Sequence, residues 1–145
     1  MGRVHYQGIA QYFPTAADHP YAEILNAARK IVFSSTLRSA DWTNSTINSG
    51  DLAAEIRKLK EAGTGDIVAR GGVSFWRSLM RLDLVDEYRI TVFPCLAGKG
   101  RRLSDDLEKM CPLELASSIA YSNGTLEQTY RPQHRASGAT GQSAA

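Results

Sequence analysis

The sequence predicts an α/β fold, with a mainly parallel mixed sheet covered by helices on both faces and an antiparallel hairpin added near the C-terminus. Helix-like and strand-like segments alternate through most of the chain, which is typical of such folds. The apolar runs at residues 30–35 and 67–69 are rich in β-branched residues, as buried parallel strands are. Asn123-Gly124 stands between two further strand-like segments, and this dipeptide favours a tight hairpin turn.

Each element follows from its local pattern. Apolar residues three and four positions apart indicate helices, and short β-branched runs bounded by polar residues indicate strands. Pro14 lies just past the end of the first helix and Pro20 lies in the first turn of the second. Asp51 caps the third helix and Gly63 stops it. The expected elements are helices over residues 3–12, from 20 to between 26 and 29, 52–62 and 73–82, strands over 30–35, 45–47, 67–69 and 84–94, and hairpin strands over 113–121 and 126–130.

Composition and charge narrow the class of protein. The 145 residues fit one domain, which we place at residues 1–131, with a disordered tail over 132–145 that has almost nothing to bury. A net charge of +2 argues against a dedicated nucleic-acid or membrane-surface binder. No apolar run approaches the ~20 residues of a membrane span, and the opening residues do not resemble a signal peptide. We therefore expect a cytoplasmic protein that acts on a small molecule.

The two cysteines follow the same expectation. Cys95 and Cys111 fit free thiols of a cytosolic protein, and neither has the spacing of a metal ligand. Cys95 lies in an apolar run, so we expect it to be a buried, inert thiol.

The segment from Asp66 to Arg81 is the strongest candidate for a functional site. An apolar strand runs into Gly71-Gly72 and then into an amphipathic helix. Glycine lets the backbone turn sharply and approach a ligand, and the free N–H groups at a helix start favour an anion such as a phosphate. Ser74 could add a hydroxyl. The pattern predicts a site for a dinucleotide diphosphate; a tight strand-to-helix turn without a ligand is the alternative.

Longer motifs connect this segment to a known family. The runs KIVFSSTL at residues 30–37 and GDIVARGGVSFWRSLMRLDLVDEYRITVFPCLAGKGRRL at residues 65–103, with DW and NST between them, resemble the dihydrofolate reductase-like family. Within it they are most similar to the C-terminal reductase domain of the riboflavin-biosynthesis bifunctional deaminase/reductase. The resemblance covers residues 1–131 and implies a three-layer αβα fold.

The resemblance also implies an activity. Its members use NADPH to transfer a hydride to a pterin- or pyrimidine-like substrate, at family level 5-amino-6-(5-phosphoribosylamino)uracil. A homodimer is implied as well, through residues 84–96 and the closing hairpin.

Three segments match the family's cofactor site. The first meets the phosphates, the second holds the adenine ribose and its 2′-phosphate, and the third binds the diphosphate. The implied residues are Gly2, Arg3, Val4 and His5 in the first, Ser34, Ser35, Thr36, Leu37 and Arg38 in the second, and Gly71, Gly72, Val73, Ser74 and Phe75 in the third.

Simpler interpretations of these residues stay open. Arg3 could be a solvated terminal residue, His5 a packing histidine, and Ser34-Ser35 a plain strand end. The basic residues at 99, 101 and 102 fit a solvated loop as well as a clamp for a substrate phosphate.

The chain also departs from the family pattern. A first central strand and a loop are expected ahead of the segment that matches Gly2-Arg3, and the printed sequence lacks them. Arg70 stands where riboflavin-pathway reductases commonly have glutamate, and Ser104 where phenylalanine is frequent. No catalytic residue can be named. A catalytically impaired nucleotide-binding or dimerisation module, or a truncated gene product, is therefore the alternative to an active reductase.

Overall fold

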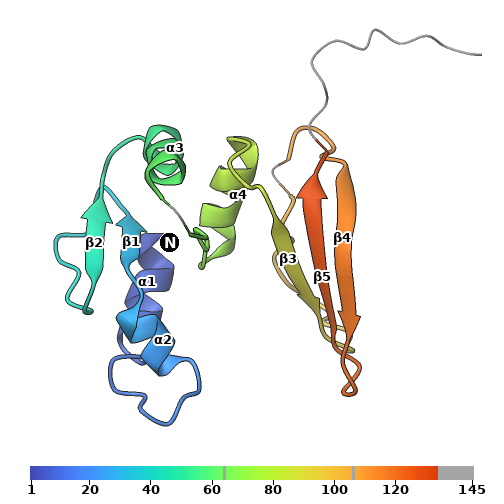
Figure 1. Cartoon of the computed structure of the whole chain (residues 1–145), viewed down its shortest axis with the longest axis horizontal. Helices are drawn as coiled ribbons and strands as arrows, with labels where there is room; N and C mark the ends of the chain where they lie inside the picture. Colours follow the sequence, from blue (N-terminus) through green and yellow to red (C-terminus); the bar gives the residue numbers. More distant parts are fainter. Residues whose placement is uncertain (64, 106, 134–145) are drawn as a thin grey trace, which may run out of the picture. The chain divides into compact units, whose positions relative to one another are not determined.

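The computed structural model describes residues 1–63, 65–105 and 107–133. It has the α/β composition that the sequence predicts (Figure 1). Of the described residues, those within 1–84 and 101–107 form one compact unit, and residues 85–100 with 108–133 form a second. The elements are α1 (Arg3–Ala10), α2 (Ala22–Ala27), β1 (Lys30–Phe33), β2 (Ser45–Asn48), α3 (Leu52–Ala62), α4 (Val73–Arg81), β3 (Tyr88–Val92), β4 (Leu113–Ala120) and β5 (Leu126–Pro132).

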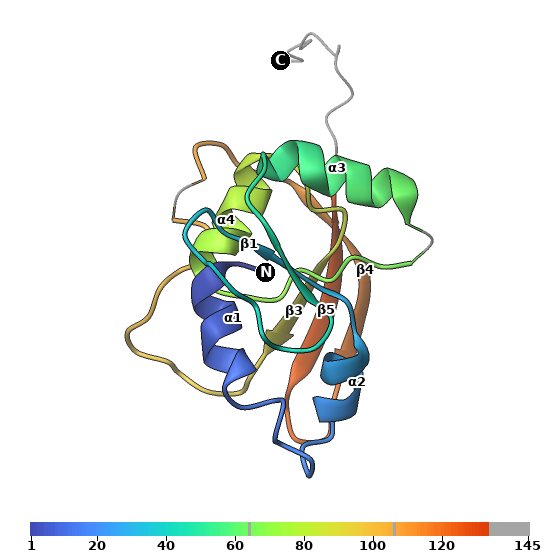
Figure 2. The same ribbon diagram turned by 90° about the vertical axis from the view of Figure 1, so that its left-hand side faces the viewer.

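The first unit is built around two parallel strands. β1 and β2 pair in register from Lys30 opposite Ser45 to Phe33 opposite Asn48. Gly2 forms a parallel bridge to Phe33, so the first two residues extend this pairing beyond β1. The Met1 nitrogen donates to the Ile31 carbonyl at 2.9 Å, and the Phe33 N–H donates to the Met1 carbonyl at 2.9 Å. α1 starts directly after this contact, beside the end of β1 (Figure 2).

An aromatic core lies under α1. Tyr6, Val32 and Trp42 are buried together, and Val32 is fully enclosed. Phe13 stacks on Trp42 with ring centroids 6.1 Å apart and planes 6° from parallel. The polar atoms of these rings are satisfied: the Trp42 N–H donates to the Tyr6 hydroxyl at 3.1 Å, and the indole N–H donates to Asn26 at 2.6 Å. This core fixes α1 against β1.

Lys30 is buried at the start of β1. Its ammonium group donates to the carbonyls of Leu25 and Ala28 at 2.7 Å and of Asn26 at 3.2 Å, all at the C-terminal end of α2. It also lies 4.5 Å from the centroid of the Trp42 ring. Burial lowers the pKa of Lys30. The three carbonyls, the negative end of the helix dipole and the ring face all favour the charged form, so the lysine joins α2 to β1.

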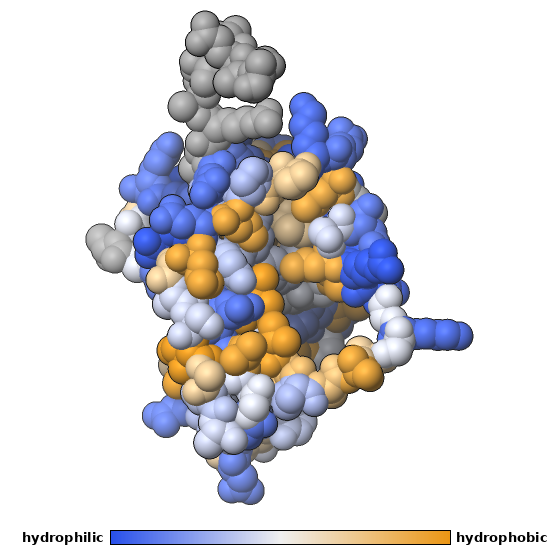
Figure 3. Space-filling view, turned by 90° about the vertical axis from the view of Figure 1, so that its right-hand side faces the viewer, coloured by the Kyte–Doolittle hydropathy of each residue, from blue (hydrophilic) through white to orange (hydrophobic). Residues whose placement is uncertain are grey.

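The second unit is a three-stranded antiparallel sheet in the order β3-β5-β4. β4 and β5 form the predicted hairpin, and Gly124 in its turn has φ +82°, a conformation that glycine adopts readily. The pairing places Tyr88, Ile90 and Val92 on the opposite face from Arg89, as the period-two pattern predicts. The register shifts between residues 115 and 117. Every side chain of β4 is exposed, and Figure 3 shows apolar and charged groups interspersed on the side of the molecule that it views.

The predicted strand over residues 67–69 is wrong. Ile67 and Val68 are 47% and 69% exposed, and the backbone there forms no strand. A short apolar run becomes a strand only where a neighbour offers its hydrogen-bonding groups. Among the described residues the parallel pair and the antiparallel sheet are separate, and neither includes this segment. The α/β class is confirmed, whereas the three-layer arrangement stays a prediction.

Other expectations had mixed outcomes. The third helix is confirmed: Asp51 caps α3 by accepting from the Ala54 N–H at 2.8 Å. Cys95 was expected in the core but is exposed, because it follows β3 in a loop where its apolar neighbours are exposed as well. The helix predicted over residues 73–82 ends at Arg81, and Leu82 beyond it is 41% exposed. Most of the tail predicted to be disordered, from residue 134 on, lies outside the described residues.

No helix of the described residues is both long and apolar enough to cross a bilayer.

Replacing Lys30 with methionine should destabilise the protein by about 2–3 kcal/mol, because hydrogen bonds from a buried, charged donor to three backbone carbonyls are lost. Urea unfolding followed by circular dichroism measures the change. Lys58→Met, at an exposed position of α3, is the matched control and should stay within about 0.5 kcal/mol of the wild type. Equal effects of the two substitutions would show that Lys30 does not join α2 to β1.

Candidate functional site

The three segments that the sequence assigns to a cofactor site meet within the first unit. Gly2 pairs with Phe33 at the end of β1. A Cβ atom placed on Gly2 would lie 3.4 Å from the Cβ of Phe75, in the first turn of α4. The rings of Phe33 and Phe75 stack with centroids 5.7 Å apart. The start of α1, the end of β1 and the start of α4 are therefore neighbours, although about seventy positions separate the first from the last.

The diglycine turn packs directly on α1. Gly71 has φ +142°, a conformation that other residues rarely adopt. A Cβ atom there would lie 3.4 Å from three carbon atoms of the His5 side chain. The backbone angle therefore favours glycine at position 71, and a Cβ there would touch the His5 side chain. At Gly72 the equivalent position is open, with nothing within 4 Å.

Both helices at this junction begin without a capping side chain. Gly2 is the N-cap of α1 and Gly72 is the N-cap of α4, and neither helix has a side-chain cap hydrogen bond or an acidic residue in its first turn. The N–H groups of a helix's first turn have no partner within the helix, and the dipole places partial positive charge there. α3 differs, because Asp51 caps it. The two helices that start at the junction thus keep the features that favour an anion.

The side chains of Arg3 and Arg70 add to the positive charge. Burial, and then the charge of Arg70, lower the pKa of His5, so the imidazole is mostly neutral near pH 7. Arg3 is exposed on the same turn of α1, and its guanidinium donates to Gln7 at 3.1 Å, one helical turn along. No carboxylate contributes to the pKa of His5 among the described residues. The junction is therefore electropositive, and no carboxylate of the described residues balances the positive charge near His5.

The second segment forms a tight turn after β1. The Ser34 N–H continues the parallel pairing by donating to the Asn48 carbonyl at 3.0 Å. The Ser34 hydroxyl oxygen accepts from the N–H groups of Thr36 at 3.2 Å and Leu37 at 2.9 Å. The ligand contact that sequence reasoning gave Ser34 stays a prediction, and within the protein its hydroxyl shapes the turn. The side chains left exposed in this turn are Ser35, Thr36 and Arg38.

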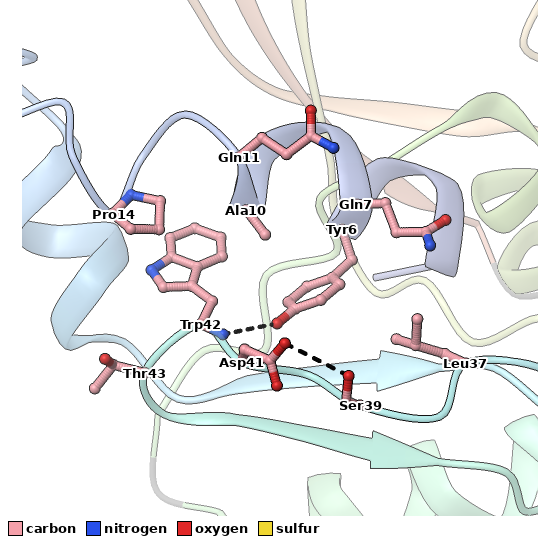
Figure 4. A pocket seen from close by; sticks show the side chains of 10 residues that line it. All are labelled: Tyr6, Gln7, Ala10, Gln11, Pro14, Leu37, Ser39, Asp41, Trp42 and Thr43. Carbon is pink, nitrogen blue, oxygen red and sulfur yellow. Dashed lines mark hydrogen bonds between the residues drawn. The ribbon is translucent and has the colours of Figure 1, made fainter.

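A pocket of about 690 Å3 lies beside this turn, and sequence reasoning missed it. α1 forms one wall with Tyr6, Gln7 and Gln11, and the chain after β1 forms the other with Leu37 and Asp41 (Figure 4). The one available signal was the spacing of Arg3, Gln7 and Gln11, which places polar residues along a single face of a helix. The remaining lining residues are Ala10, Pro14, Ser39, Trp42 and Thr43.

The basic residues at positions 101 and 102 are exposed, which agrees with the solvated loop that the sequence left open. Arg77 of α4 holds the following residues in place. Its guanidinium donates to the carbonyls of Arg102 and Leu103 and forms an ion pair with Asp105 at 3.0 Å. The part of the chain that the structure describes has no group of three or more metal-binding side chains.

Known proteins are similar to this chain in sequence or in fold. The uncharacterized protein YyaP of Bacillus subtilis (strain 168) is 30% identical over 134 residues, which cover 89% of this chain and 70% of YyaP. A crystal structure of a Shewanella sp. PV-4 protein, provisionally assigned to riboflavin biosynthesis, superposes with a TM-score of 0.72 at 25% identity and covers 92% of this chain and 72% of that one.

A pyrimidine reductase-like protein from Corynebacterium diphtheriae shares the fold, with a TM-score of 0.52 at 20% identity over 72% of this chain and 49% of that one. The model of the RibD C-terminal domain family matches residues 5–126, a range that holds most of the junction between α1, β1 and α4. The protein therefore belongs to the RibD C-terminal domain family.

Proposed function

We propose that this protein is an NADPH-dependent reductase that transfers a hydride to a pterin- or pyrimidine-like substrate. The observation that carries the proposal is the meeting of two uncapped helix starts and the end of β1 around Gly71. The similarity to a protein provisionally assigned to riboflavin biosynthesis supports a substrate of this class.

The residues present fit a dinucleotide. The uncapped start of α4 and the electropositive surroundings of His5 suit the diphosphate, because backbone N–H groups at a helix start bind phosphate oxygens. Glycine at position 71 leaves the backbone free of a side chain that would block such an approach. Ser35, Thr36 and Arg38 are exposed together after β1 and suit the ribose with its 2′-phosphate. An arginine fork can donate two bonds to one such phosphate.

The chain's own residues supply binding and orientation. NADPH would bring the hydride when bound, and the protein would hold it at a fixed position and exclude competing reactions. Arg70 adds a cation beside the diglycine turn, where the riboflavin-pathway pattern has a carboxylate. We therefore propose that Arg70 and the diglycine turn bind phosphate, and we assign no proton donor.

A second function, nucleotide binding without turnover, is favoured by one observation. Residues 67–69, which lead into the diglycine turn, form no strand and are largely exposed. A phosphate site could still form at the helix starts, while the neighbouring part of the site would not be ordered for reaction. NADPH binding without NADPH oxidation would distinguish this function from the first. A homodimer through residues 84–96 and the hairpin stays a prediction.

NADPH should raise the melting temperature of the protein. A ligand that binds only the folded state at one hundred times its Kd stabilises it by about 2.7 kcal/mol, which is several degrees for a chain of this size. Differential scanning fluorimetry measures the shift across a concentration series. A melting curve that stays in place at millimolar NADPH would contradict the proposed function.

Gly71→Ala should remove the NADPH-induced shift. Alanine at the φ angle of this position is strained by about 1–3 kcal/mol and its Cβ would touch His5, so the free protein should also melt earlier. Gly8→Ala is the matched control, because a Cβ added there, inside α1, would have nothing within 4 Å of it. Alanine is also favoured over glycine in a helix by about 1 kcal/mol. The control should keep the full NADPH shift. If both variants bind NADPH equally well, the diglycine turn is not the phosphate site.

Substitutions of the two serines after β1 should distinguish a residue that forms the turn from one that contacts the ligand. Ser34→Ala removes the acceptor for two backbone N–H groups and should cost about 1 kcal/mol of unfolding free energy. Ser35→Ala removes an exposed hydroxyl, so stability should be unchanged while NADPH affinity falls and NADH affinity does not. Chemical unfolding and titrations with both nucleotides measure these effects. A Ser35→Ala protein with wild-type preference for NADPH over NADH would contradict the 2′-phosphate assignment.

A further inference from the structure

We propose that His5 takes up a proton when the phosphates of a nucleotide bind, so that nucleotide affinity rises as the pH falls. The proposal rests on the function proposed above and adds a regulatory property to the same site. The geometry that carries it is the contact between the His5 side chain and the diglycine turn.

His5 lies against the diglycine turn. It occupies the first turn of α1, and its ring carbons lie 3.4 Å from the position that a Cβ of Gly71 would take. The next residue, Gly72, is the N-cap of α4. A phosphate bound by the first N–H groups of α4 would therefore lie close to the imidazole. Because position 71 has no side chain, nothing from that residue separates the two.

The charges that act on His5 have one sign. Arg70, from the segment that packs against α1, disfavours a second positive charge. Arg3 lies on the same helix and donates to Gln7. From α4, Phe75 contributes an apolar ring at the junction. Among the described residues, no carboxylate offsets this charge at His5.

The free and bound states therefore differ in protonation. In the free protein, burial and then Arg70 lower the pKa of His5 below its ordinary value of 6.5. A bound diphosphate would bring negative charge to the same place and favour the imidazolium, which can donate a charge-assisted hydrogen bond. A pKa that is higher in the bound state means that binding takes up a proton. The gain in affinity is full below the free-state pKa and is lost as the pH rises through the bound-state pKa.

Folding stability depends on pH with the opposite sign. Because the pKa of His5 is lower in the folded free protein than in the unfolded chain, its contribution to stability is present above pH 6.5 and is lost as the pH falls through the folded pKa. Acid should therefore weaken the free protein and strengthen its hold on the nucleotide. A general loss of structure in acid would weaken both, so the two effects can be told apart.

The test compares NADPH and NADH binding by isothermal titration calorimetry between about pH 5.5 and pH 8, a window around the ordinary histidine pKa. The proteins are the wild type, His5→Asn and His19→Asn. His19 is the matched control, because it is a half-buried histidine of the same unit that lies among Tyr12, Phe13 and Tyr21. NADPH has a 2′-phosphate that titrates near pH 6, and its effect is the same in every protein, so the difference between proteins isolates the histidine.

The wild type and His19→Asn should bind both nucleotides more tightly at low pH, by about tenfold for each pKa unit that binding adds to His5. His5→Asn should lose this part of the pH dependence. Calorimetry in two buffers of different ionisation enthalpy should show proton uptake in the wild type that is missing in His5→Asn. Arg70→Met should move the wild-type transition to higher pH, because one charge that disfavours the imidazolium is removed.

Two results would overturn the proposal in different ways. Equal pH dependence and equal proton uptake in the wild type and His5→Asn would refute the role of His5 and leave nucleotide binding intact. Failure of the wild type to bind either nucleotide at any pH, in a protein that melts cooperatively, would refute the proposed function and this inference with it.

Discussion

The parallel contact between Gly2 and Phe33 is the constraint on which the candidate site depends. It ties the first residues of the chain to the end of β1, and α1 can then start only at that end of the strand. The aromatic core of Tyr6 and Trp42 holds the helix in this orientation. α4 reaches the same place because Phe75 packs on Phe33 and because Gly71 lets the chain pass against His5. Two helices, α1 and α4, therefore start beside the end of one strand, β1.

That arrangement explains why glycine and not a capping residue begins both helices. A serine or aspartate at the N-cap would satisfy an N–H group of the first turn, as Asp51 does in α3. Gly2 and Gly72 offer no side chain to these groups, which costs helix stability and is the feature that the proposed phosphate site needs. Ser34 has the opposite role, because its hydroxyl is used within the protein to fold the turn that exposes Ser35.

Sequence patterns predicted the elements well where neighbouring residues alone determine the backbone conformation. The Asn123-Gly124 hairpin and the Asp51 cap follow from the conformations that these residues favour, and both are present. The run at residues 67–69 was misjudged, because an apolar run records what a segment could bury and not whether a neighbouring strand is there to pair with it. The contact of His5 with Gly71 and the use of the Ser34 hydroxyl depend on tertiary geometry, so no spacing in the sequence could reveal them.

The buried ammonium group of Lys30 has a consequence for how the molecule opens. It bonds the last carbonyls of α2 while its backbone belongs to β1, and Asn44 donates to two carbonyls at the same helix end. Lys30 and Asn44 both donate to the Asn26 carbonyl, so the same helix end is bonded to β1 and to the loop that precedes β2. The helix end, the strand start and the loop between Trp42 and Asn44 should therefore exchange their amide hydrogens as one cooperative segment, with a single opening free energy shared by all three.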